Sequence, residues 1–210
     1  MSALQLFLSG NDIYSDFGCL DPWSWAWAVG DLPSDAKPIT SVDALLTLNK
    51  SQTMRKFPVG VIGPREATDE QLSAAKEVGA ALANLGLTMI CGGKSGVMTA
   101  AAEGCLKAGG LSVGLIPDHE WRAANPFIAL PIATGLSEAR NMVIAKSSEV
   151  LIAIGGSYGT LSEVAYGLHF SKPVIGLCGA AQVDGVELVE TPSDAIERVG
   201  SHLFNRVRMS

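Results

Sequence analysis

From residue 57 onward, short runs of apolar residues alternate with longer stretches in which apolar residues recur at helical spacing. Apolar runs without polar alternation are typical of strands that are buried on both faces, as in parallel sheets. These runs predict strands at 58–62, 87–91, 111–116, 128–133, 150–154 and 173–178. The other stretches predict helices at 69–85, 96–108, 137–147, 159–170 and 192–199.

Signals at the ends of these segments support the alternation. Thr68 followed by Gln71 fits a capping box at the start of one helix, and Gly86 stands where the C-terminal cap of that helix is expected. Strands that alternate with helices form βαβ units, in which the strands are parallel. The sequence therefore predicts an α/β fold for residues 57–210: a doubly wound, mostly parallel Rossmann-like sheet with helices on both faces.

Residues 1–56 have a different pattern, which predicts a small N-terminal extension. Apolar runs on both sides of a polar turn at 9–12 predict a β-hairpin, and residues 41–50 predict a short helix before a linker at 51–56. Between them, Trp23, Trp25 and Trp27 alternate with small residues, which in an extended segment places the three indoles on one side. We expect these rings to cover an apolar patch of the main domain or of a neighbouring subunit, with ligand stacking as the alternative.

Composition and charge restrict the class of protein. Of the 210 residues only 17% are charged, and the mean hydropathy is +0.28, which excludes a disordered chain. A net charge of −6 and a pI near 5.0 argue against binding to the nucleic-acid backbone, which requires a basic face. With so few charged residues, part of the surface must be apolar. We expect this apolar surface to be buried between the subunits of a homo-oligomer.

The chain shows no pattern typical of a membrane span or a secretory leader. Its longest uncharged run, 123–137, is shorter than the ~20 residues of a spanning helix and is interrupted by Pro126 and Pro131. The four cysteines lie far apart, with no C-x-x-C spacing. We therefore expect no metal site, no disulfide framework and a reduced, cytoplasmic location.

Two glycine-rich turns follow strands and open helices in the same way. Their sequences are Gly92-Gly93-Lys94-Ser95-Gly96 and Gly155-Gly156-Ser157-Tyr158-Gly159. Glycine lets a ligand approach the backbone closely, and the free N–H groups of a helix N-terminus attract an anion. Neither turn is a G-x-G-x-x-G or a G-K-[ST] motif. We interpret both as phosphate-binding turns, with Lys94, Ser95 and Ser157 as additional donors; the alternative is that the glycines only form tight turns.

Residues near the second turn supply candidate polar chemistry. Thr160 and Glu163 fit a capping box, in which Glu163 folds back on its own helix; alternatively, Glu163 points into the pocket as an acid or base. Arg140 lies near a helix start, where a cation is unfavourable, so it requires an anionic ligand or Glu163 as its partner. Asn141 is a candidate to bind a base or sugar. Gly63 and Arg65, after the first strand of the sheet, are candidates for the pocket floor.

The two glycine motifs, with Arg140 between them, resemble those of the LOG (lonely guy) superfamily of Rossmann-like proteins. The resemblance covers residues 58–199. It implies a nucleotide-type pocket, which is completed in a homodimer or a larger assembly such as a tetramer. In the cytokinin-activating members, the corresponding Arg and Glu serve removal of ribose 5′-monophosphate from an adenine derivative. By this resemblance, those roles fall on Arg140 and Glu163.

The chain departs from the active members of that superfamily at several positions. Ile154 stands where a Pro precedes the glycine pair, Asn141 where a Lys follows the Arg, and Ser162 where an acidic residue precedes the Glu. These forms look more like the branch that includes molybdenum cofactor carrier proteins, which is related to the DprA/Smf proteins. The Trp-rich segment belongs to neither pattern.

Three functions follow as hypotheses. The preferred one is binding, without turnover, of a phosphorylated pterin or purine ligand such as the molybdenum cofactor or a nucleoside monophosphate, with no further cofactor required. The alternative is a phosphoribohydrolase that splits a purine nucleoside 5′-monophosphate into free base and ribose 5-phosphate, with Arg140 and Glu163 as catalytic residues. The third, DprA-like binding of single-stranded nucleic acid, is disfavoured by the net charge.

Overall fold

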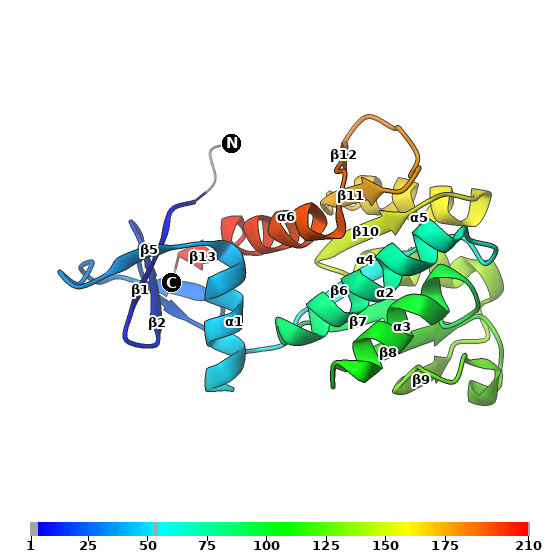
Figure 1. Ribbon diagram of the computed structural model, residues 1–210, viewed down its shortest axis with the longest axis horizontal. Helices are drawn as coiled ribbons and strands as arrows, with labels where there is room; N and C mark the ends of the chain where they lie inside the picture. Colours follow the sequence, from blue (N-terminus) through cyan, green and yellow to red (C-terminus); the bar gives the residue numbers. More distant parts are fainter. Residues whose placement is uncertain (1–3, 53, 210) are drawn as a thin grey trace. The chain divides into compact units, whose positions relative to one another are not determined.

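The computed structural model describes residues 4–52 and 54–209 of the chain (Figure 1). The chain divides into two compact units. One contains residues 1–56 and 197–210, and the other contains residues 57–196. Helix α6 (Pro192–Asn205) begins in the second unit and ends in the first. No helix among the described residues has the length and hydropathy that a membrane-spanning helix needs.

The larger unit is built on a seven-stranded sheet in which every paired strand is parallel. Its spatial order is β12-β11-β10-β6-β7-β8-β9. The strands are β6 (Pro58–Ile62), β7 (Thr88–Cys91), β8 (Ser112–Ile116), β9 (Leu130–Ala133), β10 (Val150–Ile154), β11 (Val174–Leu177) and β12 (Val186–Leu188). The predicted strands are therefore confirmed, and β12 is a strand that the hydrophobic pattern did not predict.

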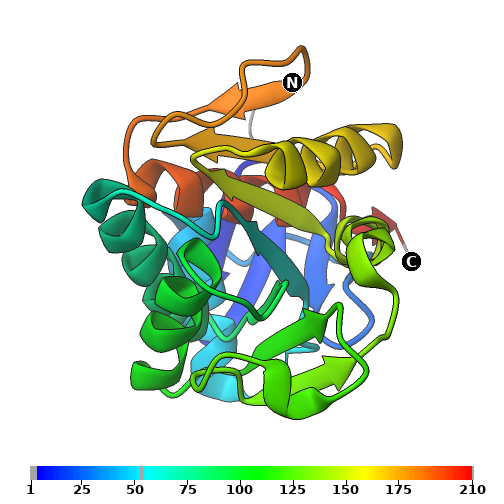
Figure 2. The same cartoon turned by 90° about the vertical axis from the view of Figure 1, so that its right-hand side faces the viewer.

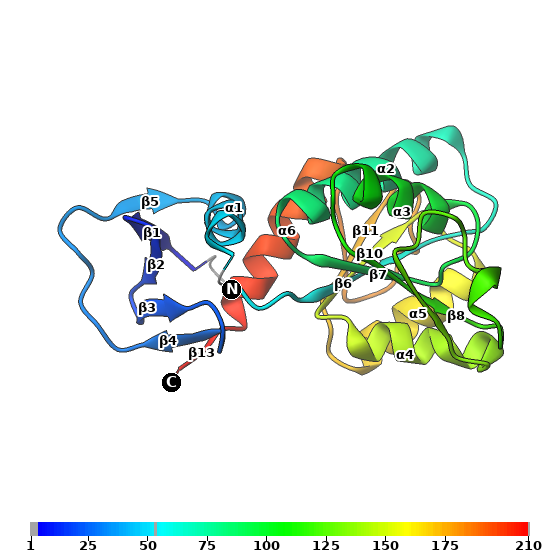
Figure 3. The same ribbon diagram turned by 90° about the horizontal axis from the view of Figure 1, so that it is seen from below.

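Helices cover both faces of this sheet. Figures 2 and 3 show α2 and α3 on one side of the strands and α4 and α5 on the other. Short 3-10 segments, Trp121–Ala123 and Ser137–Ala139, precede β9 and α4. The α-helices are α2 (Asp69–Asn84), α3 (Val97–Lys107), α4 (Arg140–Ser147) and α5 (Tyr158–His169). The prediction of a doubly wound, Rossmann-like α/β fold is confirmed.

The physical signals read from the sequence are present in this unit. All five residues of β10 are buried, as expected for a strand with helices above and below it. At the start of α2, the Gln71 amide N–H donates to Thr68 Oγ1 at 3.3 Å, and Gln71 Oε1 accepts from the Thr68 N–H at 3.1 Å. The capping box is thus confirmed. Gly86 follows the helix with φ +73°, the left-handed conformation of a helix C-terminus.

The order of the strands places a switch point between β6 and β10. From β6 the chain adds β7, β8 and β9 on one side, and then β10, β11 and β12 on the other. The connections that leave β6 and β10 therefore diverge to opposite faces and open a crevice at the carboxyl ends of these two strands. In open α/β sheets, ligands bind at this crevice.

The described residues of the smaller unit form a six-stranded sheet and helix α1, which is more than the predicted hairpin and helix. The strand order is β13-β4-β3-β2-β1-β5, antiparallel except for the β13–β4 pair. Helix α1 (Ser41–Ser51) is capped by Thr40. The strands are β1 (Leu6–Ser9), β2 (Asp12–Ser15), β3 (Gly18–Asp21), β4 (Ala26–Ala28), β5 (Lys37–Ile39) and β13 (Arg208–Met209).

The predicted one-sided row of tryptophans is wrong. Asp21 Oδ1 accepts the Trp23 N–H at 3.0 Å, and Asp21 O accepts the Trp25 N–H at 2.9 Å, so a turn interrupts the segment between β3 and β4. Trp23 is 61% exposed, whereas Trp25 and Trp27 are only 9% and 1% exposed. Trp25 packs on Phe204 of α6, with ring centroids 5.4 Å apart. The indoles of Trp25 and Trp27 therefore form part of the core of the smaller unit.

Candidate functional site

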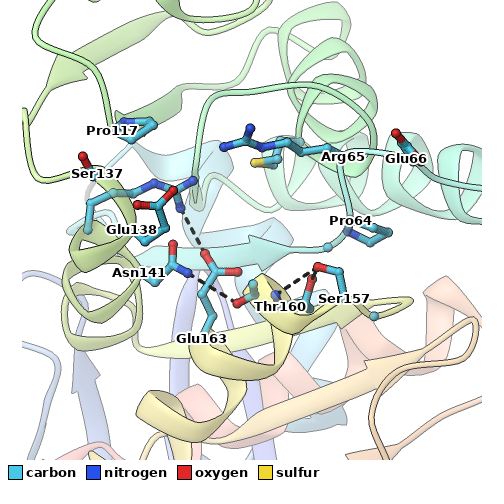
Figure 4. A pocket seen from close by; sticks show the side chains of 15 residues that line it. Pro64, Arg65, Glu66, Pro117, Ser137, Glu138, Asn141, Ser157, Thr160 and Glu163 are labelled. Carbon is cyan, nitrogen blue, oxygen red and sulfur yellow. Dashed lines mark hydrogen bonds and ion pairs between the residues drawn. The ribbon is translucent and has the colours of Figure 1, made fainter.

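A cavity of about 530 Å³ lies at the switch point of the parallel sheet (Figure 4). Its walls come from the ends of β6, β8 and β10 and from the first turns of α3, α4 and α5. Several of the predicted site residues line it together with residues that the sequence analysis did not select. The lining residues are Gly63, Pro64, Arg65, Glu66, Met98, Pro117, Ser137, Glu138, Arg140, Asn141, Gly156, Ser157, Gly159, Thr160 and Glu163.

A buried ion pair joins two walls of the cavity. Arg140 Nη1, from the first turn of α4, lies 3.2 Å from Glu163 Oε1 in α5. The side chains of Arg140 and Glu163 are only 8% and 7% exposed. Arg140 Nε is buried and has no hydrogen-bond partner among the described residues. Since a guanidinium N–H buried without an acceptor is unfavourable, the ion pair leaves one donor of Arg140 unsatisfied next to the cavity.

The orientation of Glu163 resolves the two alternatives that the sequence left open. Glu163 does not cap its own helix; the cap is Ser157, whose Oγ accepts the Thr160 N–H at 3.3 Å. Glu163 lines the cavity, where burial raises the pKa of its carboxyl to about 7 although Arg140 opposes the shift. The cavity therefore contains a carboxyl group that changes charge near neutral pH.

The N-terminus of α5 presents unusually accessible backbone to the cavity. Gly156 and Gly159 have no positive φ, so their conformations do not require glycine. A Cβ atom at either residue would meet the nearest protein atoms only at 3.7 Å. Neither conformation nor packing within the protein therefore requires glycine at these two positions, and both leave the backbone open to the cavity.

Other glycines of the two turns are required by packing within the protein. A Cβ on Gly92 would lie 2.5 Å from the Arg140 guanidinium, and a Cβ on Gly96 would lie 2.3 Å from Pro64 O. Gly155 has φ +64° and packs under the side chain of Gln71. Gly63 packs against Ile154 O and Val97 in the same way. The first turn therefore acts on the cavity indirectly, since it leaves room for Arg140.

The predicted site residues thus fall into two groups, those that line the cavity and those that do not. The open part of the second turn meets Gly63, Arg65, Asn141, Thr160 and the pair Arg140–Glu163 at the cavity. The remaining predicted residues do not line it: Gly92, Gly93, Lys94, Ser95, Gly96, Gly155 and Tyr158. Lys94 instead forms an ion pair with Asp118 at 2.9 Å, beside a neighbouring cavity.

Asn141 is held by the helix opposite to it. Its Nδ2 donates to Ser162 Oγ at 2.8 Å and to Gly159 O at 3.4 Å, so the side chain links α4 to the first turn of α5. Ser162 is one of the departures from the active superfamily members, and here its hydroxyl accepts the bond from Asn141. The two substituted positions are therefore complementary to each other.

Part of the cavity was not predicted from the sequence. Pro117 and Ser137 follow the predicted strands at 111–116 and 128–133, so the rule that ligands bind at carboxyl ends of strands was a usable signal for both. Glu66, next to Arg65, carried no separate signal. Among the described residues, no group of three or more His, Cys, Asp or Glu side chains is arranged to hold a metal ion.

The chain is similar in sequence and fold to proteins of known structure. The molybdenum cofactor binding protein of Rippkaea orientalis is 36% identical with a TM-score of 0.67, covering 70% of this chain and 98% of that one. The molybdenum cofactor carrier protein of Chlamydomonas reinhardtii is 34% identical with a TM-score of 0.66, covering 71% and 99%. An uncharacterised protein of Archaeoglobus fulgidus is 39% identical over 143 residues, which are 68% of this chain and 94% of that protein.

The resemblance inferred from the two glycine motifs is confirmed by these matches. The model of the SLOG cluster4 family matches residues 56–201, which include the whole parallel sheet and both glycine turns. The chain therefore belongs to the SLOG cluster4 family.

Proposed function

We propose that the cavity binds a phosphorylated ligand of the pterin or purine-nucleotide type, without chemical conversion, with the phosphate at the N-terminus of α5. The observation that carries this proposal is the combination of open backbone at Gly156 and Gly159 with the buried Arg140 donor beside it. A helix N-terminus and a desolvated guanidinium are both favourable surroundings for a phosphate group.

The ligand class is supported by the relatives. Two solved structures with 34–36% identity over nearly their whole lengths are described as molybdenum cofactor binding or carrier proteins. The molybdenum cofactor is a pterin that bears a phosphate, so as cargo it would present its phosphate to the α5 N-terminus. The cavity's mixture of Pro, Met and polar side chains suits a flat heterocycle with hydrogen-bonding edges.

The open glycines allow a sharp test. We expect Gly156→Ala and Gly159→Ala to fold normally, because the added methyl groups meet no protein atom closer than 3.7 Å. Each methyl would occupy the space through which a phosphate reaches the backbone, so affinity for neopterin monophosphate and GMP should fall by about tenfold or more, roughly 1.4 kcal/mol. Dissociation constants from calorimetry, with melting temperatures as a check of folding, measure both effects.

A matched control is Gly30→Ala, which adds a methyl group to the other unit, 4.0 Å from the nearest protein atom, Ala28 O, and should change neither affinity nor folding. Ligand at 100 times its dissociation constant should stabilise the wild type by ~2.7 kcal/mol. If no phosphorylated pterin or purine nucleotide raises the melting temperature, the proposed function is wrong.

Glu163 supports a second candidate function, that of a phosphoribohydrolase. A carboxyl group with a pKa near 7 inside a cavity has the properties of a general acid or base. In this reaction Arg140 would orient the nucleotide, and Glu163 would activate water or stabilise the developing positive charge on the ribose. Incubation with AMP and chromatographic assay of free adenine test it: release must be faster with wild type than with Glu163→Gln.

The remaining expectations stay predictions. Homo-oligomerisation as a dimer or tetramer, a cytoplasmic location and the lack of nucleic-acid binding rest on composition and on the superfamily resemblance. Size-exclusion chromatography with light scattering tests the first of these.

A further inference from the structure

A second cavity of about 340 Å³ adjoins the candidate site. The two cavities share Arg65, Pro117, Ser137 and Glu138, so one ligand can extend through both. In Figure 4, Pro117 and Ser137 lie across the main cavity from Ser157, on the side away from the α5 N-terminus. A ligand whose phosphate lies at α5 would therefore direct its other end, the heterocycle, toward the second cavity.

The second cavity contains a fixed pair of opposite charges. Lys94 Nζ lies 2.9 Å from Asp118 Oδ2 and also donates to Ala123 O at 3.1 Å. The backbone of Lys94 is fixed as well, because its carbonyl accepts from Thr99 Oγ1 at 2.8 Å and from Asn125 Nδ2 at 2.9 Å. The hydrogen bond from Lys94 lowers the pKa of the Asp118 carboxyl, which therefore remains ionised at neutral pH.

Both groups retain hydrogen-bonding capacity. An ammonium group has three N–H donors, and Lys94 uses two of them. A carboxylate accepts about four hydrogen bonds, and its Lys94 contact uses one. The side chain of Asp118 is 40% exposed, so it is accessible from the cavity. The pair therefore presents a donor next to an ionised double acceptor, in a fixed order.

We propose that Lys94 and Asp118 recognise the heterocycle of the ligand and select the 2-amino-4-oxopyrimidine edge that guanine and pterins share. Along that edge a carbonyl oxygen is followed by a ring N–H and an amino group. Lys94 would donate to the carbonyl, and the Asp118 carboxylate would accept from the two N–H groups in a forked arrangement. Adenine presents an amino donor followed by a ring acceptor. The Lys94 ammonium, a donor, would then face another donor, and the Asp118 carboxylate, an acceptor, would face another acceptor.

The inference rests on the proposed function and deepens it, because it names the ligand class that the same site prefers. A site that forms hydrogen bonds to one edge of a heterocycle strongly rejects an analogue with a different edge, because the polar groups of the site are then left without partners. Each charge-assisted bond contributes about 1.5–3 kcal/mol, which corresponds to roughly tenfold or more in affinity. The pair thus distinguishes pterin and guanine ligands from the adenine ligands of the hydrolase alternative.

The experiment compares dissociation constants for GMP, IMP, AMP and neopterin monophosphate by calorimetry at one pH and ionic strength. For wild type we expect GMP and the pterin to bind about tenfold or more tightly than AMP, with IMP weaker than GMP because it lacks the amino group. In Asp118→Asn, affinity for GMP should fall to that for IMP. Whether GMP or the pterin binds more tightly identifies the natural source of the edge.

Two further variants complete the test. Glu120→Gln, a neighbouring exposed carboxylate that pairs with Arg122 and lines neither cavity, should leave all four constants unchanged. Lys94→Met should weaken GMP, IMP and the pterin alike, because all three carry the carbonyl oxygen. Equal wild-type affinities for GMP and AMP, or an unchanged preference in Asp118→Asn with a normal melting temperature, would overturn this inference alone. Lack of binding by all four ligands at millimolar concentration would instead contradict the proposed function.

Discussion

Arg140 Nη1 and Glu163 Oε1 lie 3.2 Å apart in an ion pair that joins the first turn of α4 to α5 inside the cavity. Both side chains are less than one-tenth exposed. Burial nevertheless outweighs the attraction of Arg140 and raises the pKa of Glu163 to about 7. The charge of the cavity wall therefore changes within the neutral pH range, which makes the pair visible in pH-dependent measurements.

We expect the stability of the wild type to fall, relative to Glu163→Gln, as pH rises from about 5 to about 7.5. The pKa of Glu163 in the folded state, about 7, lies above its ordinary value of 4.5, so the folded protein binds more protons than the unfolded chain between these values. The stabilising contribution of the protonated carboxyl is complete below about pH 4.5 and is lost as pH rises through 7. Glutamine does not titrate, so the variant lacks this slope.

Urea denaturation of both proteins at half-unit intervals of pH measures the difference. Glu138→Gln, which changes an exposed carboxyl that lines the same cavity, is the control and should have the wild-type slope. Parallel curves for wild type and Glu163→Gln would contradict the raised pKa.

The parallel sheet could be predicted because its information is local. Runs such as 58–62 and 150–154 are apolar throughout, and Thr68, Gln71 and Gly86 mark the ends of one helix within a few residues. The location of the cavity followed from the same pattern, since the second glycine turn comes at the carboxyl end of β10. The direction of Glu163 could not be predicted, because in the sequence Thr160 and Glu163 fit a capping box. In the structure Ser157 caps the helix, and Glu163 pairs with Arg140 in the cavity instead.

Long-range contacts explain what the sequence could not show. Gly92 resembles a phosphate-binding glycine, but it is required by the Arg140 guanidinium, which comes from a helix 48 residues further along the chain (140 − 92). Similarly, the alternation of Trp23, Trp25 and Trp27 is typical of a strand, but Asp21 accepts two backbone N–H groups and forms a turn there. In both cases the residue types fit the local pattern, but a contact with a residue outside that pattern determines the structure.

We expect Gly104→Ala to lower the free energy of unfolding by about 2–3 kcal/mol, although alanine favours helices. A Cβ on Gly104 in α3 would lie 2.0 Å from Lys76 O in α2, and that backbone atom cannot move without separating the two helices. Gly159→Ala is the matched comparison, since it adds the same group to α5, where the nearest protein atom is Ser157 Oγ at 3.7 Å, and should be neutral or slightly stabilising. Equal effects of the two variants in urea denaturation would contradict the close packing of α2 and α3.

We expect Trp27→Ala to lower the free energy of unfolding of the smaller unit by about 3–5 kcal/mol, because the indole is 1% exposed and its loss leaves a large cavity. Trp23→Ala should lower it by less than about 1 kcal/mol. That ring is 61% exposed, and the Arg55 guanidinium lies over it, 5.0 Å from the ring centroid. Near-ultraviolet circular dichroism during chemical denaturation compares the two variants, and similar losses would contradict the different burial of Trp23 and Trp27.

We expect thiol reagents to separate the four cysteines into two classes. Cys91 and Cys105 are fully buried, and burial raises the pKa of their thiols to about 12 and about 11, so neither group forms the reactive thiolate in the native protein. Cys19 and Cys178 are partly exposed. Ellman's reagent should therefore modify Cys19 and Cys178 in the native state and all four cysteines in guanidinium, with peptide mass spectrometry to assign each site. Rapid modification of Cys91 in the native protein would show that β7 opens at its carboxyl end, beneath the Arg140–Glu163 pair.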